Sequence, residues 1–246
     1  MRIVKRFHNL RKQGLRHILQ DKIWGTLFDV FEKFGIHILP VHYYTPIPDT
    51  RELRKTLKNW YKKSPMQGVN LNEGSQLDLL NAFSSYSHQL EQLPDFGEMQ
   101  NAGMGPGYGE IEAHVLSAMI YHLQPEMVIE VGSGVSSLYS LAALEANQRG
   151  KLLCIEPYPS AGLKNVDNSR VSLIEKKVQK VSLQEFRVLQ DNDILFIDSS
   201  HISKLASDVN YLFLEVLPIL KKGVVIHIHD TSLPYPCSQK SVFTKL

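Results

Sequence analysis

From residue 127 onward the chain alternates short apolar runs with segments of helical periodicity, and this alternation constrains the fold more than any other feature. The apolar runs are candidate strands at 127–131, 151–156, 171–175, 194–198 and 223–229. Candidate helices lie between them at 136–148, 182–189 and 204–220. Strands that alternate with helices form parallel sheets covered on both faces. The sequence therefore predicts an α/β fold with a Rossmann-like parallel sheet.

The first 75 residues lack this alternation and are predicted to form a helical and extended segment. Apolar residues recur at helical spacing over 20–36, which predicts a helix there. Three prolines within 38–50 bar a helix, so this aromatic stretch is expected to be extended. Further helices are predicted at 51–62, 76–90 and 110–123. We therefore divide the chain into an N-terminal cap or substrate region, 1–75, and a Rossmann-like domain, 76–246.

The composition limits the classes of partner and the cellular compartment that we expect for the protein. The net charge of +2 is too small to indicate a nucleic-acid partner. The two cysteines cannot form a disulfide framework, and Cys154 lies in an apolar run, which is typical of a buried thiol in a reducing compartment. The basic first 20 residues lack the apolar core of a signal peptide, and no stretch approaches the roughly 18 apolar residues of a membrane span. We expect a cytoplasmic protein without a transmembrane segment.

The stretch IEVGSGVSS, residues 129–137, lies between the first predicted strand and a helix. Its glycines let the backbone turn sharply and approach a ligand, and the helix start offers free N–H groups. Glu156 ends the second strand, where a carboxylate can accept hydrogen bonds from both hydroxyls of a ribose. A tight turn without a ligand and a solvated surface acid are the alternatives. Together the two features favour a cofactor that contains a nucleoside.

A third group of polar residues ends the fourth and fifth strands, in IDSSH and HIHD. Because ligands of parallel sheets bind at the carboxyl ends of the strands, Asp198, His201, His229 and Asp230 are expected at the reactive edge. His227 shares the parity of His229, so both side chains are expected on one face of the sheet. His227 is interpreted as a deeper, hydrogen-bonded core histidine.

These motifs resemble the class I S-adenosylmethionine-dependent methyltransferases over residues 108–236. Taken with PVHYYTPIPD and YGEIEAHVL, they are similar to a bacterial branch that includes the macrocin O-methyltransferases. The resemblance implies S-adenosylmethionine as the cofactor and O-methylation of a hydroxyl on a sugar or small metabolite as the activity. The expected partners besides the cofactor are the small-molecule or saccharide acceptor and further copies of the chain in a homo-oligomer.

The resemblance also implies roles for single residues. Residues 130–134 would wrap the methionine part of the cofactor, Glu156 would hold the ribose, and residues 177–179 would lie near the adenine. Tyr108 and Glu110 would lie at the amino acid end of the cofactor. The implied cofactor-binding residues are Tyr108, Glu110, Glu130, Gly132, Ser133, Gly134, Glu156 and Asp198.

Related O-methyltransferases hold a divalent metal between acids at the ends of strands four and five. Here the resemblance implies a site of Asp198, His229 and Asp230 that would hold Mg²⁺ or Mn²⁺. His229 departs from the family pattern, which often has two acids at the second place, and Mg²⁺ prefers oxygen ligands.

A histidine can also take the proton of the acceptor hydroxyl, because its pKa lies near neutral pH. His201 and His229 are the candidates for this catalytic base. A helix-capping or surface role is the alternative for His201. Tyr43 and Tyr44 could stack on a sugar ring, or could pack the N-terminal segment onto the core.

The C-terminal stretch is shorter than the resemblance implies. A complete methyltransferase sheet adds two strands after the fifth, and the 16 residues after Asp230 cannot supply both. We therefore expect a truncated product whose last strands are missing, with an exposed sheet edge through which copies of the chain could pair.

Two other functions remain open at this stage. A NAD-dependent oxidoreductase shares the glycine turn and the acid after the second strand, although Ser137 stands where a dinucleotide fingerprint has glycine. An inactive cofactor-binding remnant or interaction module is the non-enzymatic alternative.

Overall fold

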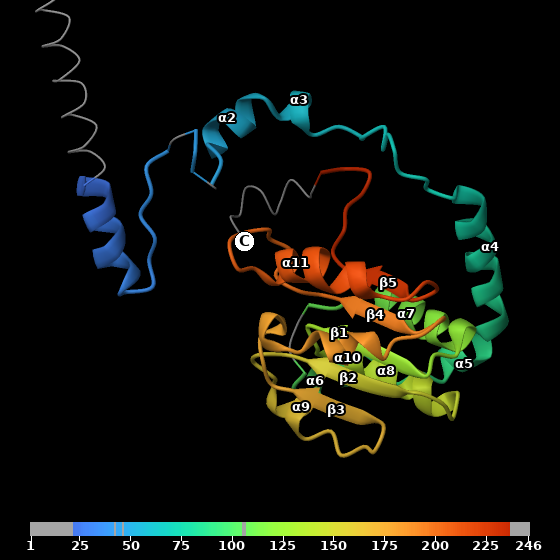
Figure 1. Cartoon of the computed structure of the whole chain (residues 1–246). Coiled ribbons are helices and arrows are strands. Elements are labelled where there is room, and N and C mark those ends of the chain that lie inside the picture. The colour runs from blue at the N-terminus through green and yellow to red at the C-terminus, as the bar shows by residue number, and fades with distance from the viewer. Residues whose placement is uncertain (1–21, 42, 46, 105–106, 237–246) are drawn as a thin grey trace, which may run out of the picture. The chain divides into compact units, whose positions relative to one another are not determined.

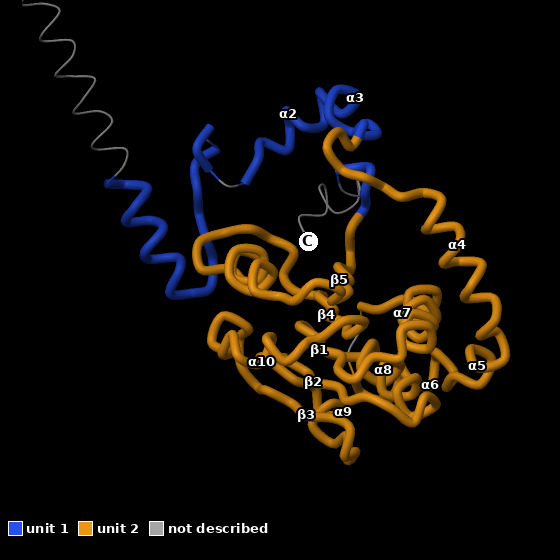
Figure 2. Tube along the Cα trace, turned by 45° about the vertical axis from the view of Figure 1, so that its right-hand side comes forward, with its two compact units in different colours: residues 1–65, 232–246 blue, residues 66–231 orange. Residues whose placement is uncertain are grey.

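The computed structural model describes residues 22–41, 43–45, 47–104 and 107–236. Contacts along the chain divide it into unit 1, Met1–Pro65 with Ser232–Leu246, and unit 2, Met66–Thr231 (Figure 2). The boundary predicted after residue 75 falls inside unit 2 and stays a prediction. Among the described residues, none of the helices combines the length and the apolarity that crossing a bilayer requires.

The described part of unit 1 contains short helices. Residues 22–32 are helical, followed by α2 (Thr50–Lys55) and α3 (Leu57–Trp60), which interrupt the single helix predicted at 51–62. Asp49 caps α2 by accepting a hydrogen bond from the Arg51 backbone N–H at 2.9 Å. Tyr61 stacks on Tyr235 with ring centroids 5.7 Å apart. Within this unit Tyr43 is almost fully exposed at 91%, and its packing onto the core or stacking on a sugar ring stays a prediction.

Unit 2 begins with helices that precede the sheet. They are α4 (Glu73–Phe83), η1 (Ser84–Tyr86), α5 (Ser87–Glu91), α6 (Phe96–Asn101) and α7 (Glu110–Leu123). The predicted helix at 110–123 is confirmed to the residue. Sequence reasoning missed α6. Asp95 caps this helix, and its side chain accepts a hydrogen bond from the Glu98 N–H at 3.0 Å.

The sheet is parallel and has the order β3-β2-β1-β4-β5 (Figure 1). Its strands are β1 (Met127–Val131), β2 (Lys151–Ile155), β3 (Val171–Ile174), β4 (Ile194–Ile197) and β5 (Val225–Ile228). All five predicted strands are confirmed, and this is the Rossmann-like fold expected from the sequence. The polar residues that end three predicted strands, Glu156, Glu175 and Asp198, lie just beyond the strands, at their carboxyl edge.

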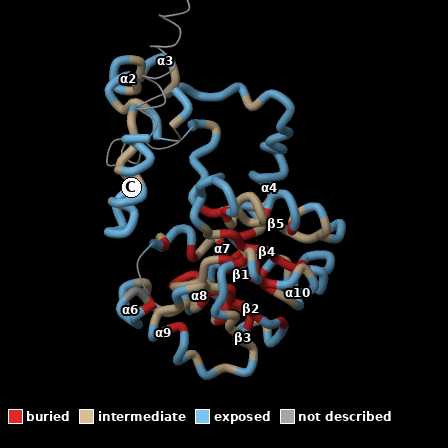
Figure 3. Tube along the Cα trace, turned by 60° about the vertical axis from the view of Figure 1, so that its left-hand side comes forward, coloured by how far each residue is buried: buried red, intermediate tan, exposed pale blue. Residues whose placement is uncertain are grey.

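Both faces of the sheet are covered, because each strand sends alternate residues to opposite sides. On one face Val128, Leu152 and Phe196 pack with helices α7 and α8 (Val135–Ala146). On the other face Ile129 and Leu195 pack with the remaining helical segments. Those segments include η2 (Val178–Lys180), α10 (Leu183–Arg187), α11 (Asp208–Tyr211), η3 (Leu212–Val216) and η4 (Leu217–Ile219). Figure 3 shows buried residues concentrated on the sheet and the helices against it.

The predicted helix at 204–220 is shorter and less regular than expected. It begins only at Asp208, because Ser207 is its cap and accepts a hydrogen bond from the Asn210 N–H at 3.1 Å. After Tyr211 it continues as one π-helical and one 3₁₀ segment, and the latter contains Pro218. The short helix α9 (Ala161–Lys164) was missed altogether.

Strand β5 is an edge strand of the described sheet, and its Ile226 is 42% exposed. Such an edge presents unpaired backbone groups that another strand can bind. Pairing of two chains through this edge stays a prediction. Cys154 is buried, as expected, and burial raises the pKa of its thiol to about 12. Cys237 lies outside the described residues.

We predict that Asp193→Ala lowers the free energy of unfolding by about 3 kcal/mol. The buried Asp193 carboxylate accepts hydrogen bonds from the backbone N–H groups of Glu126 and Met127 at 2.9 Å and of Gln190 at 2.7 Å. The substitution leaves three donors without this acceptor at the start of β1 and before β4. Urea denaturation measures the change, with the exposed Asp167→Ala as the control. Equal losses in the two variants would contradict the assignment.

Candidate active site

A pocket of about 510 Å³ opens at the carboxyl ends of β1, β2 and β4 in unit 2. The chain order reverses between β1 and β4, and parallel sheets bind their ligands at such a switch point. The pocket is lined among others by Gly132, Glu156, Lys177, Gln179 and Asp198. The sequence-predicted turn, ribose acid and adenine segment therefore meet in one pocket.

Gly132 has a backbone φ of +84°, a conformation that disfavours other residues. A Cβ added at this position would overlap the carbonyl oxygen of Asp198. The turn is also tied to its neighbours, because the Gly132 N–H donates to the Ile155 carbonyl at 3.0 Å and the Asp198 N–H donates to the Val131 carbonyl at 2.8 Å. The absence of a side chain thus lets the glycine turn lie directly against the end of β4.

Glu130 is fully buried and turns toward helix α8 rather than into the pocket. Its carboxylate accepts hydrogen bonds from the hydroxyls of Ser137 at 2.5 Å and Ser140 at 2.6 Å. Ser137 Oγ in turn accepts from the Gly134 N–H at 3.2 Å. Burial raises the pKa of Glu130 to about 7, although both serine hydroxyls favour its charged form. In this geometry Glu130 anchors the turn, and its predicted contact with a cofactor stays a prediction.

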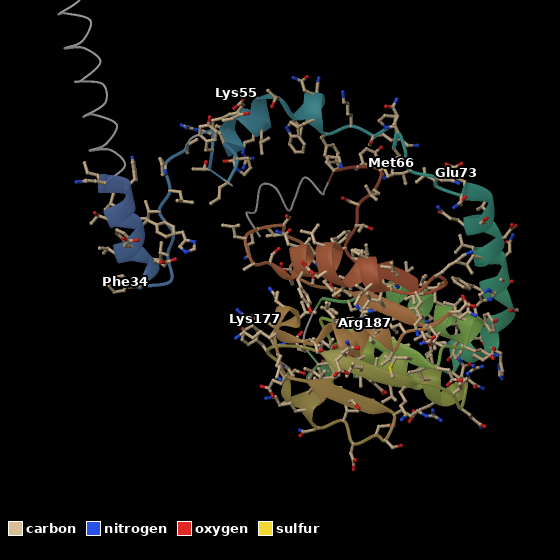
Figure 4. All side chains as sticks on the ribbon, viewed as in Figure 1. Phe34, Lys55, Met66, Glu73, Lys177 and Arg187 are labelled. Carbon is tan, nitrogen blue, oxygen red and sulfur yellow. The ribbon has the colours of Figure 1, made fainter. Side chains whose placement is uncertain are left out.

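Glu156 lines the pocket, as the ribose role requires. One of its oxygens accepts a hydrogen bond from the Ser133 N–H at 3.3 Å, and the other accepts from the Tyr158 N–H at 2.8 Å. Lys177 follows β3 and is labelled in Figure 4. Gln179 donates to the Ala206 carbonyl at 2.8 Å across the pocket wall.

Beside this pocket a cluster of acids and imidazoles forms at the ends of β4 and β5. Donor atoms of Asp198, His201 and Asp230 all lie within 4.8 Å of one another. His201 Nε2 lies 3.2 Å from Asp198 Oδ1 and 3.6 Å from Asp230 Oδ2. His201 and Asp230 both have left-handed backbones, with φ of +57° and +54°.

His229 lies against the same carboxylates from the buried side, with an exposure of 6%. Its Nδ1 is 3.2 Å from Asp198 Oδ1 and its Nε2 is 3.4 Å from Glu112 Oε1. The Asp198 carboxylate is the main cause that raises the pKa of His229, with Asp230 and Glu112 adding to it against the effect of burial. The predicted metal ligands Asp198, His229 and Asp230 are therefore brought together, with His201 as a fourth neighbour.

The prediction that His227 is the more deeply buried of the two histidines is wrong. His227 is only half-buried, whereas His229 is buried. Its ring packs edge-on against Phe196, with centroids 4.8 Å apart, and burial lowers its pKa. The shared parity with His229 holds, because Phe196 contacts both rings.

The start of α7 covers the buried imidazole. Tyr108 is buried, and its ring lies 4.9 Å from that of His229. Burial raises the pKa of Tyr108, whose hydroxyl donates to the Glu112 carbonyl at 3.2 Å. Glu110 is exposed as the first residue of α7. Sequence reasoning missed Glu112. Acids are common in the first turn of a helix, because they interact favourably with the helix dipole, so this one did not stand out.

Comparison with known proteins agrees with this geometry. A methyltransferase domain family matches residues 129–231, from within β1 to just beyond β5. An uncharacterized protein of Archaeoglobus fulgidus is 30% identical over 196 residues, which cover 72% of this chain and 87% of the relative. The chain belongs to the class I S-adenosylmethionine-dependent methyltransferases. Enzymes of this class take their methyl group from S-adenosylmethionine.

Two solved methyltransferase structures resemble this methyltransferase more remotely. An S-adenosylhomocysteine-bound methyltransferase from Podospora anserina is 13% identical with a TM-score of 0.38, covering 79% of this chain and 73% of that chain. An O-methyltransferase of tomaymycin synthesis from Streptomyces achromogenes, in complex with S-adenosylmethionine, is 16% identical with a TM-score of 0.42. This match covers 61% of this chain and 73% of that chain.

We predict that Glu130→Gln changes how the stability of the methyltransferase depends on pH. Above the ordinary pKa of 4.5 the unfolded chain loses this proton, but the folded chain keeps it up to about pH 7. The contribution of Glu130 to the free energy of unfolding therefore falls as pH rises from 4.5 to 7, by about 3 kcal/mol at most. Urea denaturation of wild type and variant at several pH values measures the difference. A difference that stays constant across this window would contradict the assignment.

Proposed function

We propose that this methyltransferase transfers the methyl group to a hydroxyl oxygen of a sugar or another small metabolite. The observation that carries the proposal is the position of Asp198, which lines the cofactor pocket and also belongs to the acid and imidazole cluster. A hydroxyl group is a poor nucleophile until its proton leaves. A base and acids beside the methyl donor suit oxygen as the acceptor atom.

The pocket supports a definite orientation of the cofactor. Glu156 would accept hydrogen bonds from the ribose hydroxyls, and the turn at residues 132–134 would hold the methionine part. Residues 177–179 would lie along the adenine, with Tyr108 and Glu110 toward the amino acid end. When bound, S-adenosylmethionine supplies an electrophilic methyl carbon. The chain itself contributes mainly by holding the acceptor oxygen in line with that carbon.

His201 is the better placed of the two candidate bases. Its side chain is 34% exposed, whereas that of His229 is 6% exposed and lies between carboxylates. Asp198 Oδ1, 3.2 Å from His201 Nε2, can orient the ring and stabilise the imidazolium that forms when the hydroxyl proton is taken.

A divalent cation fits the same cluster. Two carboxylates from different strand ends, Asp198 and Asp230, approach each other beside imidazoles, and acids this close repel unless a cation or proton lies between them. Mg²⁺ or Mn²⁺ would be held by Asp198, Asp230 and a histidine. Such a cation would lower the pKa of a bound hydroxyl.

We predict that Glu156→Gln weakens S-adenosylmethionine binding at least tenfold, because one charged acceptor of the ribose hydroxyls is lost. Isothermal titration of the purified chain measures the affinity. The exposed Glu185→Gln is the matched control and should bind like wild type. Titration with NAD runs in parallel, and binding of NAD in place of S-adenosylmethionine would favour the oxidoreductase alternative.

We predict that Asp198→Asn and Asp230→Asn each lower methyl transfer at least 100-fold while S-adenosylmethionine still binds. The amide keeps the shape of the carboxylate but not the charge that orients His201 and holds a cation. Formation of S-adenosylhomocysteine with a panel of hydroxyl acceptors measures turnover, with Asp167→Asn as the control. Unchanged turnover in both variants would refute the assignment of the active site. Binding without transfer in the wild type would favour a cofactor-binding module.

A further inference from the structure

A second pocket lies at the other end of the sheet, at the amino ends of β1 and β2 in unit 2. It has a volume of about 490 Å³, and its lining holds three cationic side chains and one acid, Arg149, Lys151, Arg170 and Glu126. Three positive charges against one negative charge leave the lining with an excess of two positive charges. The candidate active site lies at the carboxyl ends of the strands, so the proposed methyl transfer gives this pocket no role.

Arg170 is held in a fixed position on the wall of this pocket. Its Nη1 donates a hydrogen bond to the Gly150 carbonyl at 2.9 Å. Gly150 has a φ of +85°, and a Cβ at this position would overlap the Pro125 carbonyl oxygen, so the turn that carries the acceptor is tightly packed. Within the described residues no carboxylate pairs with the Arg170 guanidinium, which keeps its other N–H donors for a ligand.

Two further donors of the pocket have no partner within the part of the chain that the structure describes. The Lys151 ammonium group has no acid beside it, and the buried Gly150 has no acceptor for its backbone N–H. The neighbouring N–H groups are satisfied, because that of Arg149 donates to the Leu144 carbonyl at 3.2 Å. That of Lys151 donates to the Glu126 carbonyl at 3.0 Å. Backbone N–H groups of buried residues are nearly always paired, so the unpaired one points to an acceptor that a ligand supplies.

The acid of the lining is already engaged, and it is engaged weakly. Glu126 Oε1 lies 2.8 Å from Arg149 Nη2, and both side chains are about half exposed or more. Exposed ion pairs of this kind contribute little free energy, because water screens them. An anion that enters the pocket can therefore compete with Glu126 for Arg149 and also reach the two cations that have no acid partner.

We propose that this pocket binds the phosphate group of a small phosphorylated molecule, with the Arg170 guanidinium, the Lys151 ammonium group and the Gly150 N–H as its donors. Arginine suits phosphate, because its planar group can donate two parallel hydrogen bonds to phosphate oxygens. A volume of about 490 Å³ is typical of pockets that hold small organic ligands, so the body of the molecule has room beside its phosphate. The inference is independent of the proposed methyl transfer.

Isothermal titration of the full chain tests the proposal, in a buffer without phosphate and at constant ionic strength. The probes are ribose 5-phosphate, inorganic phosphate and ribose. Ribose 5-phosphate should bind, ribose should not, and inorganic phosphate should bind more weakly than the ester, because it lacks the organic body. Binding of inorganic phosphate alone would overturn the assignment to a phosphorylated molecule. The absence of binding by either phosphate would overturn the site itself.

Two variants place the bound phosphate in this pocket. Lys151→Ala and Arg170→Ala should each weaken the binding of ribose 5-phosphate about tenfold, because each removes a charged hydrogen-bond donor. Lys222→Ala is the matched control and should bind like wild type, since Lys222 is also exposed and precedes a strand, β5, but lies outside the pocket. Equal losses in Lys151→Ala and Lys222→Ala would mean general attraction to a positive surface and would overturn the proposal.

A third variant should change the affinity in the opposite direction. Glu126→Gln keeps the shape of the side chain but removes the charge that competes for Arg149, so ribose 5-phosphate should bind several-fold more tightly than to wild type. Damage to the fold would not strengthen binding, which separates this result from a structural effect. The exposed Glu185→Gln is the control and should leave the affinity unchanged. Weaker or unchanged binding in Glu126→Gln would contradict an anion site at this pocket.

Discussion

The close approach of Gly132 to the backbone of Asp198 is the contact on which the site depends. Strand β1 lies between β2 and β4, and only a glycine fits where its exit turn passes the end of β4. This approach makes the glycine turn and Asp198 parts of one wall of the pocket. Because Asp198 N–H also donates to the Val131 carbonyl, neither side of the wall can move without the other.

The alternation of side chains along the strands then sorts the polar groups. Glu130, Phe196 and the two β5 histidines point to the face covered by α7 and α8. On that face Glu130 meets serines at the start of α8, and His229 meets Tyr108 and Glu112 at the start of α7. The first turns of two helices thus support two parts of the candidate site, α8 beneath the glycine turn and α7 over the imidazole of His229.

Sequence reasoning predicted the strands and the carboxyl edge well, because apolar runs and their polar last residues report directly on a parallel sheet. It could place His201, His229 and Asp230 at one edge, but not in order of depth, since His227 and His229 share a parity and differ only in what covers them. It missed the partners of Glu130, because Ser137 and Ser140 are ordinary residues of the helix that follows the turn. It missed the partner of His229, because Glu112 is distant in sequence and ordinary in its own helix. Contacts of this kind follow from the packing of helices on the sheet, and single-sequence periodicity does not report them.

The left-handed backbone of His201 has a consequence for how this chain tolerates change. A residue with a Cβ is held there at a cost of about 1 kcal/mol, which glycine or asparagine would largely relieve. Stability alone therefore favours loss of the imidazole at this position. A library of variants sorted only for folding or expression would accumulate glycine at residue 201, and would enrich stable chains that have lost the proposed base. Selection for thermal resistance would therefore act against the imidazole on which the proposed mechanism relies.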